Sequence, residues 1–268
     1  MPKAPDLAPA IAPAAPVPVA AAPYALERPS GSTASHWNHL RAIDPAWLRK
    51  LVIGDAIAPV AAEQYRRLAG AVHDLQVEHG LKTLMVTSAV PGEGKTLTII
   101  NLALTLSEAC KRRVLLLDAD LRRPTVHDVL RLPNTRGLSD VLRADCADLP
   151  ILQLSDYLSV LPAGRLDSPM ALTSERMSTL LDTLSGSFDW VLIDAAPVGF
   201  MPEARLLARL TKAVLFVIAA RATPHPLVTR AVAEIGAESI VGTVLNSVSD
   251  EDIPAASYYQ DYYAPGVR

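Results

Sequence analysis

From residue 81 onward, the chain alternates short apolar runs with longer amphipathic segments. An apolar run of about four to eight residues is typical of a buried strand, whereas apolar residues about three or four positions apart indicate a helix. Strands are therefore predicted over residues 81–88, 112–118, 158–162, 190–194, 213–219 and 239–246. Helices are predicted over residues 95–110, 174–185, 203–210 and 227–235, with Gly236 as the C-cap of the last one.

This alternation predicts a parallel sheet whose strands are joined by crossover helices. No internal repeat is visible, so residues 80–250 are predicted to form one doubly wound α/β domain, with a mostly parallel sheet flanked by helices. One more helix is predicted upstream, over residues 61–78, where apolar side chains share one face: Tyr65, Leu68, Val72 and Leu75.

The two ends of the chain differ in composition from this central part. Eight of the 22 prolines and ten alanines fall within the first 30 residues, a composition that favours extended, solvated backbone. Folded structure is expected to begin around Trp47. We therefore expect a disordered arm over residues 1–40, a folded domain over residues 41–250 and a flexible, tyrosine-rich tail over residues 251–268.

Composition narrows the classes of function. The 268 residues carry a formal net charge of -3 with a pI of about 6.1, so no nucleic-acid partner is expected. Cys110 and Cys146 lie far apart without paired histidines, which argues against a zinc site and against a secreted, disulfide-built protein. No apolar run approaches the roughly 18 residues that span a membrane, and prolines interrupt the only candidate signal peptide, so a cytosolic protein is expected.

The clearest functional motif is AVPGEGKT at residues 89–96. It matches the nucleotide-binding pattern GxxxxGK[ST] except that Ala89 replaces the first glycine. A predicted strand enters it and a predicted helix leaves it, so backbone N–H groups and the helix N-terminus would converge on a polyphosphate. The candidate nucleotide-binding residues are Pro91, Gly92, Glu93, Gly94, Lys95, Thr96 and Leu97. The alternative is a glycine-rich turn with an exposed lysine.

Aspartates follow two of the predicted strands. Asp118 and Asp120 lie in LLLDADLRRP, and Asp194 ends VLID in the manner of a Walker B carboxylate. Carboxylates at the carboxyl ends of strands open into the crevice where such sheets bind ligands, and they suit Mg²⁺. Either run alone is as readily a simple strand terminus. Because both runs follow the glycine-rich loop in this order, each strengthens the interpretation of the other as part of a nucleotide and metal site.

The loop, the DxDxR element at Asp118, Asp120 and Arg122, and the run FDWVLIDAAP resemble the bacterial tyrosine kinases (BY-kinases) of capsule and exopolysaccharide biosynthesis, of the CpsD/CapB-like cytoplasmic type. The segments LPAG and SERM add to the resemblance, which covers the chain from about residue 60 to its end. It implies a P-loop NTPase fold of the Min/Par-related (SIMIBI) type. The Min and Par ATPases carry a signature lysine where this chain has Val90, which favours the kinase branch.

The tail supports this reading. Four of the seven tyrosines lie in the last eleven residues: Tyr258, Tyr259, Tyr262 and Tyr263. They could instead pack in a terminal strand, but YYQDYY does not alternate and is flanked by Pro254 and Pro265, which favours a flexible tail. The resemblance implies that this cluster is the autophosphorylation substrate.

The expected reaction is transfer of the terminal phosphate of ATP to tyrosine with the help of Mg²⁺. The candidate catalytic residues are Lys95, Asp118, Asp120 and Asp194, and the candidate Mg²⁺ ligands are Thr96, Asp120 and Asp194. Asp118 is the candidate acceptor of the tyrosine proton, because a phenol with a pKa of about 10 gains from a positioned carboxylate.

Two further residues carry open alternatives. Arg122 either orients phosphate or a neighbouring subunit, or is a surface arginine. Asn246 resembles the adenine-contacting position of the family, or else ends a strand in a satisfied turn.

The chain departs from the family pattern in places. The assembly motif ExxRxxR reads Glu63, Arg66 and Ala69, so its last arginine is missing and a ring built on it is in doubt. The proline pair expected after Asp194 reads Ala196-Pro197, and Glu203 stands where the family usually has Asp.

The resemblance also implies partners: a membrane-embedded polysaccharide chain-length (co-polymerase) protein as activator, further copies of the chain, and a tyrosine phosphatase. The protein would then lie at the inner face of the cell membrane through its partner. Two other functions stay open, a Min/Par-like switch ATPase in a polysaccharide-export assembly and a noncatalytic nucleotide-binding scaffold.

Overall fold

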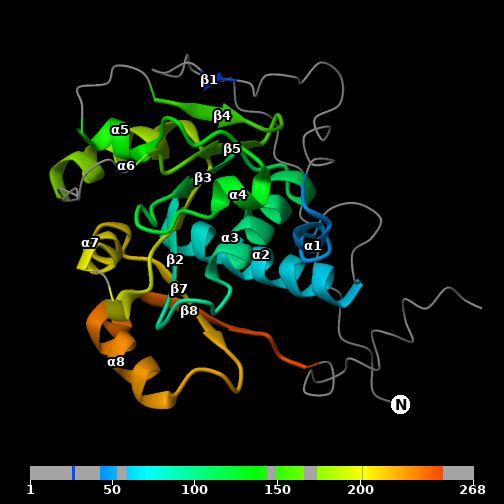
Figure 1. Ribbon diagram of the computed structural model, residues 1–268, viewed down its shortest axis with the longest axis vertical. Coiled ribbons are helices and arrows are strands. Elements are labelled where there is room, and N and C mark those ends of the chain that lie inside the picture. The colour runs from blue at the N-terminus through cyan, green and yellow to red at the C-terminus, as the bar shows by residue number, and fades with distance from the viewer. Residues whose placement is uncertain are drawn as a thin grey trace, which may run out of the picture.

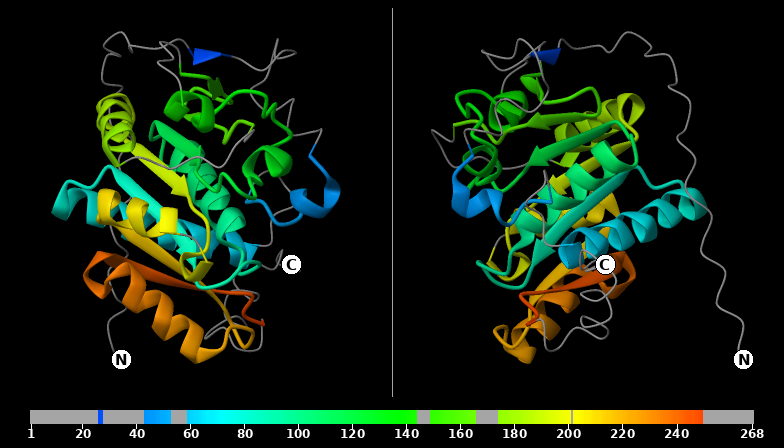
Figure 2. Two further views of the ribbon diagram at one scale, coloured as in Figure 1. Left: turned by 60° about the vertical axis from the view of Figure 1, so that its left-hand side comes forward. Right: turned by 90° about the vertical axis from the view of Figure 1, so that its right-hand side faces the viewer.

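The computed structural model describes residues 26–27, 43–52, 59–143, 149–165, 174–200 and 202–249. Within them, an eight-stranded sheet lies between two layers of helices (Figures 1 and 2). The predicted tyrosine-rich tail lies outside these residues, and so does the predicted N-terminal arm apart from its short strand Leu26–Glu27.

The sheet has the order β1-β4-β5-β3-β6-β2-β7-β8, and only β4 and β5 run antiparallel to each other. Its strands are β1 (Leu26–Glu27), β2 (Thr83–Ser88), β3 (Val114–Asp118), β4 (Ile151–Gln153), β5 (Leu158–Leu161), β6 (Trp190–Asp194), β7 (Val214–Ala219) and β8 (Ile240–Asn246). All six predicted strands are therefore confirmed. Strands as short as β1 and β4 give no periodic signal and were not predicted.

The helices are α1 (Pro45–Leu48), α2 (Pro59–His79), α3 (Lys95–Leu104), α4 (Val126–Leu130), α5 (Leu138–Arg143), α6 (Ser174–Ser187), α7 (Pro202–Thr211) and α8 (His225–Ile235). All predicted helices are confirmed. The helix predicted over residues 95–110 is α-helical through Leu104 and continues as a π-helical turn, Thr105–Ala109. Gly236 caps α8 with a φ of 88°. Among the described residues, no helix is long and apolar enough to cross a membrane.

Helices cover both faces of the sheet, with α2 and α3 on one side and α6, α7 and α8 on the other (Figure 2). Successive side chains of a strand point to opposite faces. Leu116 of β3 accordingly packs in one core cluster, whereas Leu115 and Leu117 pack in the other. A strand buried on both faces needs apolar residues at every position, which explains the unbroken apolar runs in the sequence.

The central strands β2, β3 and β6 end at the same edge of the sheet. Asp118 at the end of β3 pairs in register with Asp194 at the end of β6, and Asp194 also lies opposite Val86 of β2. The loop after β2 leads into α3 at this edge. The fold therefore brings together the segments in which the sequence placed its phosphate and metal chemistry.

The segment 43–52 is anchored to α3 ahead of the sheet. The side chain of Asn101 donates to the carbonyl of Lys50 at 2.9 Å and accepts from the N–H of Val52 at 2.9 Å. Ile43 and Leu51 are buried in the core beside it. This segment therefore packs as part of the domain.

Candidate functional site

The loop of residues 89–94 joins the end of β2 to the start of α3 and depends on two glycines. Gly92 and Gly94 have φ angles of 87° and 89°, a left-handed region that side chains with a Cβ rarely adopt. Gly94 is also the N-cap of α3, and a Cβ there would lie 2.0 Å from the side-chain nitrogen of Asn246. Both the backbone angle and the close approach thus require glycine at position 94.

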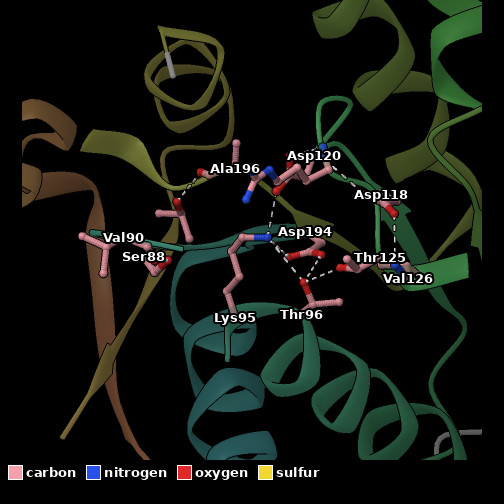
Figure 3. Close-up of polar contacts among 12 residues, drawn as sticks. Ser88, Val90, Lys95, Thr96, Asp118, Asp120, Thr125, Val126, Asp194 and Ala196 are labelled. Atoms are coloured by element: carbon pink, nitrogen blue, oxygen red, sulfur yellow. Dashed lines mark hydrogen bonds and ion pairs between the residues drawn. The ribbon is translucent and has the colours of Figure 1, made fainter. Parts of the chain in front are cut away.

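Lys95, Thr96, Asp120 and Asp194 meet at the carboxyl edge of the sheet (Figure 3). Lys95 Nζ lies 3.0 Å from Asp120 Oδ2 and 3.6 Å from Asp194 Oδ1. Thr96 Oγ1 donates to Asp194 Oδ2 at 2.7 Å. These four side chains come from the start of α3, the loop just after β3 and the end of β6, so the edge of the sheet holds a compact group of acids around one lysine.

Asp118 lies beside this group but is held by the backbone. It is fully buried, and its two oxygens accept hydrogen bonds from the N–H groups of Asp120 and Val126, each at 3.2 Å. Asp118 thereby fixes the loop after β3 and the first turn of α4 (Figure 3). Its position makes it a neighbour of the metal candidates and an anchor of the loop that carries Asp120.

Burial and charge shift the ionisation of this cluster. Burial, followed by the charge of Asp194, raises the pKa of Asp118 well above the usual range of an aspartate. Burial likewise raises the pKa of Asp194, against the opposing effect of Lys95. For Lys95, burial lowers the pKa, but the nearby carboxylates of Asp194 and Asp120 outweigh it and raise the pKa overall. The one positive charge of Lys95 therefore does not balance the negative charge of the buried aspartates, whereas those aspartates keep Lys95 protonated.

The cluster fits a divalent cation. Asp194 Oδ1 is buried, and no group in the described part of the chain donates a hydrogen bond to it, although Lys95 Nζ lies 3.6 Å away. A buried carboxylate oxygen without a donor is costly, and Mg²⁺ or a water bound to it would satisfy that oxygen. The hydroxyl of Thr96 adjoins the same carboxylate, which makes Thr96, Asp120 and Asp194 chemically suitable ligands.

The remaining candidate residues lie around the loop in different ways. Pro91 is exposed, and the side chain of Leu97 packs against the core, so Leu97 can face a phosphate only through its backbone. Arg122 forms an ion pair with Glu203, at 3.1 Å, and contacts none of the four clustered side chains. Tyr258, Tyr259, Tyr262 and Tyr263 lie outside the described residues.

Two other candidates make contacts that the sequence did not suggest. The side chain of Asn246 donates to the backbone carbonyl of Glu93 at 2.8 Å. The carboxylate of Glu93 is only 2% exposed and accepts hydrogen bonds within the protein from Val90, Ala219 and Thr223. The side chain of Glu93 is therefore directed into the protein, and only its backbone is available to a phosphate.

Sequence reasoning missed Thr125, whose hydroxyl donates to Thr96 Oγ1 at 3.1 Å (Figure 3). Thr125 is the N-cap residue of α4, although its side chain makes no capping hydrogen bond there. A hydroxyl residue just before a helix normally predicts a cap, so no sequence signal shows that this hydroxyl contacts Thr96 at the start of α3 instead.

Comparison with known proteins places this geometry in a family. No protein-family model matches the chain. The chain is 32% identical to the tyrosine-protein kinase YwqD of Bacillus subtilis over 69% of this chain and 80% of that protein. It is 27% identical to the putative tyrosine-protein kinase CapB of Staphylococcus aureus over 78% of this chain and 94% of that protein. A longer relative, the succinoglycan biosynthesis transport protein ExoP of Rhizobium meliloti, is 30% identical, and the match spans 23% of its length.

Solved structures of similar proteins have the same fold. The chimerical protein CapA2B2 superposes with a TM-score of 0.64 at 26% identity, covering 75% of this chain and 91% of that one. The kinase domain of the Escherichia coli tyrosine kinase ETK superposes with a TM-score of 0.62 at 26% identity, covering 70% of this chain and 78% of that one. The septum site-determining protein MinD of Pyrococcus horikoshii shares the fold, with a TM-score of 0.53 at 24% identity, covering 68% of this chain and 76% of that one.

The predicted P-loop fold and the predicted kinase family are therefore both confirmed, and the switch-ATPase alternative is not favoured. The chain belongs to the bacterial tyrosine kinases, the protein-tyrosine kinases of capsule and exopolysaccharide biosynthesis.

Proposed function

We propose that the chain binds ATP with Mg²⁺ at its glycine-rich loop and phosphorylates its own C-terminal tyrosines. The observation that carries this proposal is the meeting of Lys95, Thr96, Asp120 and Asp194 beside the loop that ends at Gly94. Phosphoryl transfer needs positioned positive charge and a metal site more than covalent chemistry, and this cluster offers both.

The protein side chains have separate roles. Lys95 binds the terminal phosphates and reduces the negative charge that would repel an incoming tyrosine oxygen. Backbone N–H groups between Gly92 and Thr96 orient the phosphate chain at the N-terminus of α3. Mg²⁺, when bound, supplies further positive charge to the phosphates, and Thr96, Asp120 and Asp194 would hold it directly or through water.

Asp118 is proposed to accept the proton of the attacking tyrosine. It sits opposite Asp194 in the sheet, and backbone N–H groups hold its carboxylate in place. A base held in a fixed orientation helps proton transfer more than a mobile one does. Asp118 therefore combines two tasks, shaping the loop that carries Asp120 and accepting the proton.

The acceptor is proposed to be the cluster Tyr258, Tyr259, Tyr262 and Tyr263. Tyr258 follows Asn246 by twelve positions, and Asn246 contacts the loop of residues 89–94 through the carbonyl of Glu93. Because an extended chain spans about 3.3–3.6 Å per residue, such a segment reaches about 40 Å. That length serves a site on the same molecule or on a neighbour, and we propose transfer between neighbouring copies.

Assembly and location complete the proposal. ExoP, a longer relative, is named as a biosynthesis transport protein, and its similarity to this chain covers only part of its length. We propose that a membrane-embedded co-polymerase activates this chain by gathering copies of the kinase at the inner face of the membrane. A tyrosine phosphatase would reset the tail, as any reversible phosphorylation requires.

The test follows ATP labelled on its γ-phosphate. With Mg²⁺, label should accumulate on protein tyrosine, and replacing the four tail tyrosines by Phe should remove most of that label while ATP binding is retained. Release of label as free phosphate, with none on protein, would instead show a switch ATPase.

A further inference from the structure

Glu93 carries the one polar side chain of the loop of residues 89–94, and that side chain is buried although Pro91 and Gly92 are exposed. Its Oε2 accepts a hydrogen bond from the N–H of Val90 at 2.7 Å, which closes the loop upon itself. Its Oε1 accepts from the N–H of Ala219 at 3.2 Å and from the hydroxyl of Thr223. One carboxylate thus joins the loop to the end of β7 and to the turn that precedes α8.

A second hydrogen bond also joins the loop to this side of the sheet. Asn246 at the end of β8 donates through its side chain to the carbonyl of Glu93, and its own carbonyl accepts from the N–H of Ala220 at 2.8 Å. The loop, the turn after β7 and the end of β8 are therefore linked in one closed set of hydrogen bonds. This set lies at the opposite side of the loop from Asp120 and Asp194, because β7 and β8 lie on the other side of β2 in the sheet.

Glu93 is buried without a positive partner. Among the described residues, no lysine or arginine forms an ion pair with its carboxylate. Taking a carboxylate out of water is costly, and only several well-placed donors offset that cost. Such a residue is a poor way to stabilise a loop for its own sake, because an apolar side chain would fill the same space at lower cost.

We propose that Glu93 is a positioning residue for nucleotide binding. Its carboxylate holds the phosphate loop at a fixed distance from the ends of β7 and β8, so that the phosphate chain and the nucleoside of ATP are bound at the same time. In open α/β sheets, ligands lie across the carboxyl ends of the strands, which is where these two groups of contacts meet. The inference rests on the proposed nucleotide site but requires no tyrosine transfer.

The test measures the dissociation constant of a fluorescent ATP analogue by titration. Glu93→Ala should weaken binding about 10-fold or more, since hydrogen bonds to a charged group are each worth more than neutral ones. Thr223→Val, which removes one donor outside the loop, should weaken binding about threefold. Glu93→Gln should lie between Glu93→Ala and the wild type, because an amide oxygen can still accept from one side of the set.

The double variant carries the sharpest prediction. If Thr223 acts through the Glu93 carboxylate, adding Thr223→Val to Glu93→Ala should cause no further loss of affinity. Glu108→Ala is the matched control, since Glu108 is a partly buried carboxylate that accepts from the hydroxyl of Ser155 at 2.6 Å beyond the far end of α3. It should lower the melting temperature without changing the dissociation constant.

Unchanged nucleotide affinity in a folded Glu93→Ala variant would overturn the inference. So would a double variant whose loss of affinity equals the product of the two single-variant losses. The outcome is separable from that of the proposed function. A wild type that binds the analogue but phosphorylates no tyrosine would contradict the kinase mechanism and leave the Glu93 test intact. A wild type that binds no analogue would refute the nucleotide site and the inference together.

Discussion

At the scale of single residues, the site is defined by one lysine among three buried aspartates. Lys95 is within 3.6 Å of both Asp120 and Asp194, and Asp118 lies beside them at the end of β3. The excess of negative charge is unfavourable in the free protein, and a cation would relieve it. The same arrangement that weakens the fold therefore prepares the site for metal and phosphate.

Lys95→Met should abolish tyrosine phosphorylation, with a loss of at least about 100-fold, because it removes the charge proposed to stabilise the transferring phosphate. Phosphotyrosine per molecule under Mg²⁺ and ATP is the measurement. Lys82→Met is the matched control, since Lys82 lies just before β2 begins, at the other end of that strand, and its ammonium donates to the carbonyl of Ser185 at 2.9 Å. Wild-type phosphorylation in a folded Lys95→Met variant would refute the site.

Asp194→Asn should stabilise the metal-free protein at neutral pH. Burial raises the pKa of Asp194 above its unfolded value, so ionised Asp194 favours the unfolded chain. That penalty is fully present above the folded-state pKa and disappears as the pH falls below the unfolded value of about 4. Removing the charge should add about 1 kcal/mol, or roughly 2–4 °C in Tm, at pH 7.

Thermal unfolding in EDTA at several pH values checks this. Asp182→Asn, on an exposed position of α6, should leave the Tm unchanged. A lower Tm for Asp194→Asn at neutral pH, or a gain that persists undiminished in acid, would contradict the charge argument.

The sequence identified which residues carry the chemistry more reliably than what each side chain contacts. Lys95, Thr96, Asp120 and Asp194 were named from motif order, and the structure brings them together. The inward direction of Glu93 was missed, because nothing in GEGKT says which way a loop side chain turns. The contacts of Thr125 and Arg122 depend on residues 29 and 81 positions away, which no local pattern encodes.

At the scale of elements, long periodic segments were predictable and short ones were not. The central strands are buried on both faces and gave unbroken apolar runs, so their type and order could be read from the sequence. By contrast, β4 has only 3 residues and pairs antiparallel with β5, a detail fixed by tertiary pairing alone. The π-helical turn after α3 likewise has no sequence pattern that distinguishes it from α-helix.

On helix α2, the positions of the assembly motif ExxRxxR do not all face the solvent. Glu63 forms ion pairs with Arg66 at 3.0 Å and Arg67 at 3.5 Å on the solvent side. Ala69, where the family motif has its last arginine, is only 1% exposed and packs in the core. In this chain, position 69 therefore faces the core of its own domain, and an arginine could not simply be restored there.

Ala69→Arg should destabilise the protein by about 3 kcal/mol or more, because the side chain overfills the core and carries an unpaired charge. It should not promote assembly. Ala71→Arg, at an exposed position of the same helix, is the control and should change the Tm little. Thermal unfolding and light scattering measure both effects. An unchanged Tm together with a larger assembly for Ala69→Arg would contradict this placement.

At the scale of the whole molecule, the active site and its proposed acceptor lie on different parts of the chain. The site lies at the carboxyl edge of the sheet, and the tyrosines proposed as acceptors lie within residues 258–263. Transfer between copies makes the reaction depend on encounter, so any partner that concentrates the kinase raises its rate.

Mixing two variants tests this. Lys95→Met keeps the tail but lacks the site, whereas the variant with four tail tyrosines changed to Phe keeps the site but lacks the acceptor. Their mixture should place phosphate on the tail of Lys95→Met, at a rate per molecule that rises with concentration. An unmodified Lys95→Met tail, beside active wild type under the same conditions, would show that transfer stays within one molecule.

The central claim is that this site phosphorylates this tail, and mass spectrometry of the peptide spanning residues 251–268 tests it most directly. After wild-type protein is incubated with Mg²⁺ and ATP, the peptide should carry phosphate on members of the cluster Tyr258, Tyr259, Tyr262 and Tyr263, and EDTA should prevent it. An unmodified peptide, with phosphotyrosine only at Tyr24, Tyr65 or Tyr157 or with ATP converted to free phosphate, would contradict the account.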